Sequence, residues 1–256
     1  FGIGCSFSST PFGLKIPPEK KIIHATLDSE DINKNVLAEH ALLGDARLVL
    51  EALVSEIKER LQGVSRGRSQ KISGEIQRIK SDWIKQWNPK LNSSEQPLSP
   101  YRVIWDLMKT VDLPNTIITH DSGSPRDQLS PFWESVTPLS YIGWGKSTQL
   151  GYGLGLAMGA KLAQPDKLCI NVWGDAAIGF TGTDLETAAR EQIPILSILF
   201  NNFCMAVELP YYPAATEKYR VTDISGNYTQ MANSLGCYSE RIEKPSEIVP
   251  ALKRGI

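Results

Sequence analysis

The stretch that decides the fold is LCINVWGDAAIGFTGTDLETAAREQIPILSILFNN, residues 168–202. Two short apolar runs, 167–173 and 194–200, enclose a helical pattern at 181–192. A strand, a helix and a second strand in this order predict two parallel strands joined by a crossover. Asp175 directly follows the first strand, and Asn201 and Asn202 directly follow the second. Because parallel strands end at one edge of the sheet, where α/β folds place ligands, we expect these side chains to lie together.

The residue types at this edge are typical of a metal and phosphate site. Asp175 and Asn202 offer carboxylate and amide oxygens, which Mg²⁺ prefers, with water and phosphate oxygens completing its shell. The small residues Ala176 and Ala177 leave backbone N–H groups for a diphosphate at the start of a helix. On the residues alone, an aspartate turn and an asparagine-rich loop with no ligand remain the alternative.

The glycine-rich segment GWGKSTQLGYGLGLAMGA, 143–160, matches neither common nucleotide motif. A phosphate loop needs a glycine five residues before Gly145, where Ser140 stands. Gly153, Gly155 and Gly159 form GxGxxxG inside a helical pattern, whereas dinucleotide binding requires GxGxxG between a strand and a helix. These glycines therefore predict close packing of a helix on a sheet.

The rest of the chain continues the alternation of strands and helices. Around the central stretch, the pattern predicts helices at 100–111, 148–163 and 225–236, a strand at 115–121, and a last strand and helix at 237–242 and 246–254. This order predicts an α/β fold whose parallel sheet is flanked by helices on both faces. At the front, strands are predicted at 1–7 and 21–28 and a helix at 40–61.

A change in composition divides the chain. Residues 63–98 are polar and rich in Ser, Asn and Pro, with one helix at about 70–87, which is typical of a linker. We therefore predict a partial domain at 1–62, a linker at 63–98 and a second domain at 99–256. The chain opens with Phe1 in an apolar run, so it is expected to begin inside a domain.

Composition excludes several classes of protein. Among 256 residues, 41% are hydrophobic and the formal net charge is -1, which argues against a nucleic-acid partner. No apolar run reaches the ~18 residues of a membrane span. The four cysteines are far apart without a CxxC pair, which indicates neither zinc nor disulfides and favours a cytoplasmic protein.

Three segments together resemble a known family. GDA and NN, separated by the 24 residues 177–200, resemble the diphosphate and metal signature of thiamine-diphosphate enzymes. GKSTQLGYGLGLAMGAKLA, 145–163, resembles a segment of acetolactate synthases. IIHATLDSEDINKN at 22–35 and HALLGDARLVLEAL at 40–53 resemble the second half of that family's central domain. The chain is thus similar to acetolactate synthase-like enzymes over nearly its whole length.

The resemblance implies a thiamine-diphosphate-binding fold at 99–256, preceded by part of a Rossmann-like central domain. It implies that thiamine diphosphate and Mg²⁺ are the cofactors, with the metal held by the side chains of Asp175 and Asn202 and by the Cys204 carbonyl. Leu150 matches the apolar residue that supports the bent cofactor. The remaining positions that match the cofactor-binding residues are Gly123, Ser124, Gly174, Ala176 and Ala177.

The implied activity is cleavage or formation of a C–C bond next to the carbonyl of a 2-oxo acid, by a transferase or lyase that works as a homodimer or homotetramer. One alternative is an enzyme of the 2-hydroxyacyl-CoA lyase or oxalyl-CoA decarboxylase type, which takes an acyl-CoA substrate. Another is a fragment that binds the cofactor without catalysis.

The sequence also departs from the family pattern. Ala176 stands in place of a glycine, and DSGSPRDQ at 121–128 stands where acetolactate synthases have a Gly-Gln-His run. GCSFSST, 4–10, lacks the acidic pair and the arginine that accompany FAD, so FAD is not expected. The glutamate that activates the cofactor belongs to an N-terminal domain that no segment here resembles, and Glu186 is interpreted as structural or loop-contacting. The resemblance therefore implies no catalytic residue within this chain, and the fragment is expected to be inactive alone.

Overall fold

The computed structural model describes residues 1–9, 15–64, 67–143 and 149–256, which form two compact units, 1–79 and 80–256. The GKST motif, 145–148, and with it the first residue of the helix predicted at 148–163, lie outside the described residues. None of the described helices is long and apolar enough to cross a membrane.

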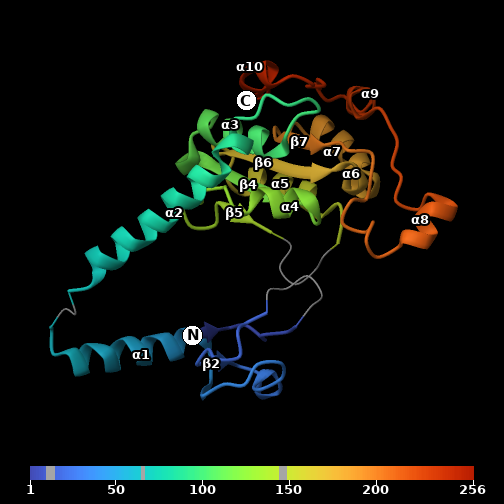
Figure 1. Cartoon of the computed structure of the whole chain (residues 1–256). Helices are drawn as coiled ribbons and strands as arrows, with labels where there is room; N and C mark the ends of the chain where they lie inside the picture. Colours follow the sequence, from blue (N-terminus) through green and yellow to red (C-terminus); the bar gives the residue numbers. More distant parts are fainter. Residues whose placement is uncertain (10–14, 65–66, 144–148) are drawn as a thin grey trace. The chain divides into compact units, whose positions relative to one another are not determined.

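The larger unit is built on a parallel sheet (Figure 1). Its strands have the order β5 (Tyr141–Ile142), β4 (Thr116–His120), β6 (Leu168–Gly174) and β7 (Leu196–Phe200), and every neighbouring pair is parallel. All five residues of β4 and the five middle residues of β6 are buried. Burial of successive residues, which point to opposite faces, requires cover on both sides. The predicted parallel sheet flanked by helices is therefore confirmed.

One face of this sheet carries the larger apolar cluster. Ile118, Ile170 and Val172 of the strands pack there with Ile104 and Leu252 from two covering helices. The helices on this side are α3 (Pro100–Thr110), α4 (Ser124–Leu129), α10 (Pro245–Gly255) and the second half of α2 (Ser69–Leu91). The predicted helices at 100–111 and 246–254 are confirmed as α3 and α10.

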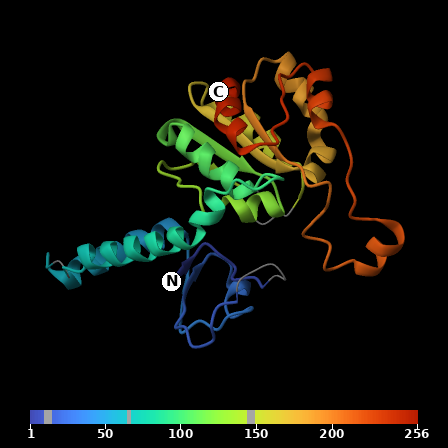
Figure 2. The same cartoon turned by 45° about the horizontal axis from the view of Figure 1, so that its top comes forward.

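The opposite face is covered by α5 (Tyr152–Ala163), α6 (Asp175–Thr181), α7 (Leu185–Arg190) and α9 (Tyr228–Ser234). Trp173 of β6 packs there against Leu154, Ala177 and Ile178. The unit also has short 3-10 helices at Leu113–Asn115 and Gly182–Asp184, and α8 (Pro213–Tyr219), which projects away from the sheet (Figures 1 and 2).

The glycines of α5 only partly follow the prediction of close packing. A Cβ on Gly153 would lie 2.4 Å from Asn171 Oδ1 and 3.1 Å from the His120 backbone, so α5 approaches the sheet closely there. Gly155 and Gly159 are exposed, and a Cβ on either would meet nothing within 4 Å. Close packing is therefore confirmed at Gly153 and wrong for the other two.

The smaller unit contains a second parallel sheet, in the order β1 (Gly2–Ile3), β2 (Ile23–Thr26) and β3 (His40–Leu43), with a 3-10 helix at Ser29–Asp31 and α1 at Ala46–Leu61. The helix predicted at 40–61 is wrong at its start, because its first four residues pair with β2 as β3. The helix begins only after Asp45, whose side chain accepts hydrogen bonds from the N–H groups of Arg47 and Leu48 at 2.9 and 3.1 Å.

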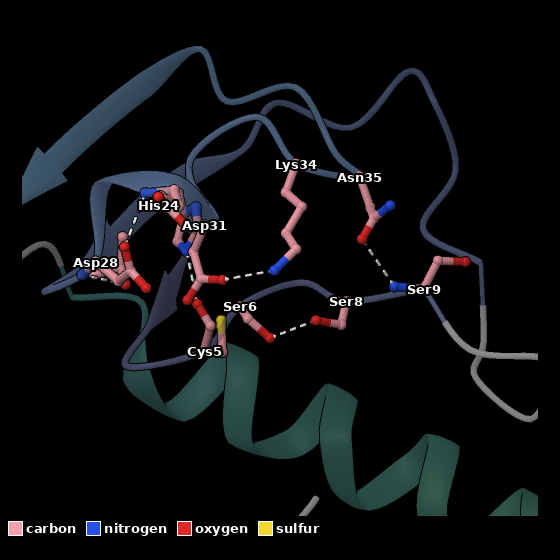
Figure 3. A network of polar contacts seen from close by, with 11 residues as sticks. Cys5, Ser6, Ser8, Ser9, His24, Asp28, Asp31, Lys34 and Asn35 are labelled. Carbon is pink, nitrogen blue, oxygen red and sulfur yellow. Dashed lines mark hydrogen bonds and ion pairs between the residues drawn. The ribbon is translucent and has the colours of Figure 1, made fainter.

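The strand predicted at 1–7 is also shorter than expected, because only Gly2–Ile3 pairs with β2. The next residues form a loop held by polar contacts (Figure 3). His24 Nε2 lies 2.7 Å from the Cys5 carbonyl oxygen, and the hydroxyls of Ser6 and Ser8 are 2.7 Å apart. The chain leaves the extended conformation at Gly4, which has a φ of 63°.

Two further predictions are wrong in the larger unit. Residues 237–242 form no strand, and the segment predicted as one helix at 181–192 is divided among the last residue of α6, a 3-10 turn and α7, which ends at Arg190. The predicted end of a helix at Gly236 is confirmed, since α9 ends at Ser234 and Gly236 has a φ of 87°.

Candidate functional site

The candidate site lies at the carboxyl edge of the larger sheet, where neighbouring strands end in polar residues. β6 and β7 end in register, with Gly174 opposite Phe200. Asp175, 4% exposed, follows β6, and its Oδ2 accepts a hydrogen bond from the Asn202 N–H at 3.1 Å. Its Oδ1 accepts the N–H of Ala176 at 2.9 Å. The crossover between the strands thus brings Asp175 and Asn202 into direct contact.

The loop after β7 has a backbone shape that depends on its asparagines. Asn201 Oδ1 accepts the N–H of Phe203 at 3.2 Å, and Asn202 Oδ1 accepts the N–H of Cys204 at 3.1 Å. Between them, Phe203 has a φ of 58°, in the left-handed region that costs a bulky residue about 1 kcal/mol or more. Two consecutive side-chain turns stabilise this conformation.

Cys204 presents its backbone carbonyl within this loop. Cys204 forms an isolated antiparallel bridge with Asp223. The two hydrogen bonds of this bridge are donated by the Met205 N–H to the Thr222 carbonyl and by the Ile224 N–H to the Phe203 carbonyl. These bonds use the residues beside Cys204 and not its own N–H or carbonyl. Among the described residues, no donor reaches the Cys204 carbonyl oxygen, which leaves it available as a ligand.

The chemistry of this donor set fits a hard divalent cation. Asp175 supplies a carboxylate, Asn202 an amide oxygen and Cys204 a carbonyl oxygen, and such ligands suit Mg²⁺ better than a soft metal. Among the described residues there is no group of three His, Cys, Asp or Glu side chains that could hold a metal. Any cation held here would therefore depend on neutral oxygens beside the single carboxylate of Asp175.

The segment 121–128, here called the phosphate-side loop, contains the predicted cofactor-binding residues Gly123 and Ser124 and lies next to the end of β6. A Cβ on Gly174 would be 3.5 Å from Pro125 Cγ, so the turn that contains Gly123 and Ser124 borders the Asp175 edge. Gly123 has a φ of 81° and a ψ of −149°, which favour glycine, and it directly precedes α4. Ala177 is 1% exposed with its side chain in the core, so only its backbone N–H could meet a ligand.

Leu150 lies two residues before α5, partly buried against the cluster of Leu154, Trp173 and Ile178. Gly151 follows it with a φ of 84°. A Cβ on Gly151 would lie 2.8 Å from Thr181 Cγ2, so this turn presses against the end of α6. The structure thus places Leu150 on the same apolar cluster as the first turn of α6, which begins at Asp175.

Two further polar residues at this edge were not singled out from the sequence. Asp121 directly follows β4, just as Asp175 directly follows β6. This position after a strand is the feature of the sequence that could have identified Asp121 as a site residue. Burial raises the pKa of Asp121, while hydrogen bonds from the N–H groups of Gly153, Gly151 and Ser122 lower it in part. His120, the last residue of β4, is 4% exposed, and burial lowers the pKa of its imidazole.

Glu186 lies outside this group. It is exposed on α7, and its carboxylate is 2.9 Å from Arg190 Nε one turn further on. The contact is an ordinary ion pair on a solvated helix face, which contributes little to stability.

Comparisons with known proteins agree with this geometry. The family "Thiamine pyrophosphate enzyme, C-terminal TPP binding domain" matches residues 121–256, which include every residue of the site described above except His120. This range begins at Asp121, directly after β4, and extends to the last residue of the chain.

Curated relatives extend the similarity to the whole chain. A probable acetolactate synthase large subunit of Methanococcus aeolicus is 29% identical over 99% of this chain and 44% of that protein. One of Methanocaldococcus jannaschii is 30% identical over 99% of the chain and 43% of that protein. An acetolactate synthase large subunit of Corynebacterium glutamicum is 30% identical over 93% of the chain and 38% of that protein.

The chain thus spans less than half the length of these relatives. The family match covers more than half of the chain and contains the Asp175–Asn202 contact at the ends of β6 and β7. On this match and this geometry, the chain belongs to the thiamine pyrophosphate enzymes and carries their C-terminal cofactor-binding domain.

Proposed function

We propose that this chain supplies the diphosphate- and Mg²⁺-binding part of an acetolactate synthase-like enzyme that breaks or forms C–C bonds at 2-oxo acids. The observation that carries the proposal is the contact between the Asp175 carboxylate and the Asn202 N–H across the ends of β6 and β7. The names of the similar proteins, acetolactate synthase large subunits, support the choice of reaction class.

In this proposal, Asp175 is the charged ligand of Mg²⁺, and the Asn202 side chain and the Cys204 carbonyl are neutral ligands. The Asn202 backbone N–H donates to Asp175 Oδ2, which keeps the two residues adjacent, and the Asn202 side-chain oxygen accepts the Cys204 N–H and has a second lone pair for a cation. The diphosphate is held by Gly174, with Gly123, Ser124 and the backbone N–H groups of Ala176 and Ala177. The Ala176 N–H, which now binds Asp175 Oδ1, would exchange that contact for a phosphate oxygen.

When bound, thiamine diphosphate supplies a nucleophilic carbon and an electron sink for the substrate carbonyl. The residues of this chain would hold the cofactor at two places. Leu150, in a turn that packs against Thr181, would support its apolar part, and Asp175 and Asn202 would hold its diphosphate end together with the metal. Burial of Asp175 would strengthen its interaction with the cation by excluding water.

Further parts of the proposal concern the whole enzyme. We place the activating carboxylate outside these residues, since Glu186 is exposed and ion-paired with Arg190. The 256 residues by themselves are then a cofactor-binding fragment without turnover. A homodimer or homotetramer, which the resemblance implies, is the assembly in which we expect the 2-oxo acid to be converted.

Calorimetric titration with thiamine diphosphate in the presence of Mg²⁺ tests the site. The wild-type chain should bind and Asp175→Ala should not, because the substitution removes the charged ligand of a hard cation. Chelating Mg²⁺ with EDTA should abolish binding by the wild-type chain as well.

Asp166→Ala is the matched control, since Asp166 is an exposed aspartate in the turn before β6. It should bind like the wild type. Circular dichroism must show that both variants keep the fold. Unchanged affinity in a folded Asp175→Ala protein would refute the assignment of the site.

A further inference from the structure

We propose that Asp121 is the positioning residue of the cofactor site: its buried carboxylate fixes the turn of Leu150 against the phosphate-side loop. This inference rests on the proposed function, because it assigns a task to Leu150 and to the loop that contains Gly123. The sequence resemblance assigned no role to Asp121.

Asp121 is 0% exposed, and both of its oxygens accept hydrogen bonds from backbone N–H groups. Oδ1 accepts from Gly151 at 2.8 Å and from Ser122 at 3.0 Å, and Oδ2 accepts from Gly153 at 3.1 Å. The Gly153 N–H is one of the first N–H groups of α5, which have no partner within the helix, and Gly151 is the residue directly before that helix. One carboxylate therefore caps α5 and at the same time belongs to the strand end that continues into the phosphate-side loop.

Two threonines hold the same turn through its carbonyl groups. The Thr181 hydroxyl at the end of α6 donates to the Gly151 carbonyl at 2.8 Å. The Thr119 hydroxyl of β4 donates to the Gly153 carbonyl at 2.8 Å. Side chains from β4, α6 and the segment after β4 thus hold the turn from Gly151 to Gly153, and Leu150 is bonded directly to Gly151.

The arrangement requires an acceptor without hydrogens. A carboxylate can accept all three N–H groups, whereas the amide of an asparagine would turn its own NH₂ toward at least one of them. Buried donors left without a partner are costly, and hydrogen bonds to charged groups are stronger than neutral ones. Asp121→Asn, which keeps the shape of the side chain, should therefore loosen the turn of Leu150 selectively.

The test compares two ligands whose contacts differ. Inorganic pyrophosphate with Mg²⁺ needs the diphosphate end of the site, whereas thiamine diphosphate with Mg²⁺ also needs Leu150. In calorimetry, Asp121→Asn should weaken thiamine diphosphate about tenfold, as loss of a hydrogen bond to a charged group would, and pyrophosphate by less than about threefold. A purely structural role would weaken both ligands by the same factor.

Asp127→Asn is the matched control, because Asp127 lies in the same segment with its side chain 55% exposed. It should leave both affinities unchanged. Thr181→Val removes the hydroxyl that donates to Gly151 and should show the same selective loss, with exposed Thr183→Val as its control. Thr181→Val carries the comparison if Asp121→Asn does not fold.

Amide hydrogen exchange provides a readout that needs no ligand. The Gly151 and Gly153 amides should be protected in the wild-type chain and exchange at least about tenfold faster in Asp121→Asn. Rapid exchange of both amides in the wild-type chain, or an equal loss of both ligands in the variants, would overturn the role of Asp121. Absence of binding of either ligand to the wild-type chain, with protected amides, would instead overturn the proposed function and the positioning role that depends on it.

Discussion

At the scale of single residues, the same residue type has different physical tasks at neighbouring positions of α5. Gly153 lies where the helix touches Asn171 and the backbone of His120, and Gly155 lies two residues further on in open space. Gly151 adopts a left-handed φ of 84° before the helix begins. Close approach to the sheet thus requires glycine at 153 and backbone conformation requires it at 151, whereas neither reason applies to Gly155.

The substitutions Gly153→Ala and Gly155→Ala should change stability in opposite directions. Gly153→Ala puts a methyl group 2.4 Å from Asn171 Oδ1 and should destabilise the protein by about 1–3 kcal/mol through overpacking. Gly155→Ala meets no atom within 4 Å and should stabilise it by up to about 1 kcal/mol, because alanine favours helix. Free energies of unfolding from urea titrations measure both. Equal effects would mean that α5 does not contact the sheet at Gly153.

His120 should make the stability of the protein depend on pH. Burial is the main cause that lowers the pKa of its imidazole below the ordinary 6.5 in the folded state. The charged Arg126 acts in the same direction, and the nearby Asp121 and Asp127 oppose it. As the pH falls below 6.5, the unfolded chain takes up the proton before the folded chain does. The contribution of His120 to the free energy of unfolding is therefore fully present above pH 6.5, and it is lost as the pH falls toward the lowered pKa of the folded state.

Urea titrations of the wild type and His120→Gln at about pH 7.5 and about pH 5.5 test the linkage. The wild type should lose more stability between these values than the variant, which has no titrating ring at this position. Equal losses would show that the folded and unfolded states bind this proton alike.

At the scale of elements, the loop after β7 contains two asparagines that shape its backbone in the same way but differ in their contact with Asp175. Asn201 and Asn202 make the same kind of bond, each from its side-chain oxygen to the N–H two residues on. Of the two, only Asn202 also donates a hydrogen bond from its backbone N–H to the Asp175 carboxylate. The two asparagines are therefore similar in their effect on the loop but differ in their place at the proposed metal.

Asn202→Ala should weaken binding of thiamine diphosphate with Mg²⁺ by about tenfold or more, since a neutral metal ligand is lost. Asn201→Ala removes an equivalent turn bond and should reduce stability by a similar amount, about 1 kcal/mol, with little change in affinity. Calorimetric titration and urea unfolding of both variants give the two quantities. A larger loss of affinity in Asn201→Ala would reassign the ligand to that residue.

At the scale of the whole molecule, α2 belongs to both compact units along its length. The units divide at residues 79 and 80, within this helix. In its second half, Trp83, Ile84 and Trp87 pack with the core around Leu91, and Trp83 stacks on Phe132 with ring centroids 4.8 Å apart. The half before residue 80 contains no buried residue. This half is therefore held by few contacts of its own.

Limited proteolysis should cut first between residues 62 and 80, within the segment where we propose the boundary between the domains. The packing of Trp83, Trp87 and Leu91 protects the later part of that segment, 80–98. Trypsin has Arg68, Lys71 and Arg78 available there. Mass spectrometry of the first products locates the cut. First cuts at 150–200 would contradict both the boundary and the stability assigned to the cofactor-binding unit.

Local pattern was sufficient for the central strands. The apolar runs at 115–121, 167–173 and 194–200 became β4, β6 and β7, because strands buried on both faces have nearly continuous apolar sequences. The positions of Asp175 and Asn202 directly after two of these strands predicted that they would meet at one edge. This part of the candidate site follows from chain order and from the shared direction of parallel strands.

Local pattern was insufficient where several partners were possible. HALL at 40–43 fits both a helix and a strand, and only pairing with β2 selected the strand. The segment 237–242 has strand-like residues, but among the described residues it pairs with no strand. Hydrogen bonds between strands are contacts distant in sequence, and periodicity within a short window cannot contain them.

The sequence alone determined the strands β4, β6 and β7, the helices α3 and α10, the family resemblance and the residues that meet at the ends of β6 and β7, because these depend on local hydrophobicity and on neighbours along the chain. Only the tertiary structure decided that α5 touches the sheet at Gly153 and not at Gly155, since this depends on the rotation of the helix on the sheet. It also decided that Asp121 accepts N–H groups from Gly151 and Gly153, which are about thirty residues further along the chain. A buried carboxylate finds its donors by packing in three dimensions, and no spacing within the sequence specifies that choice.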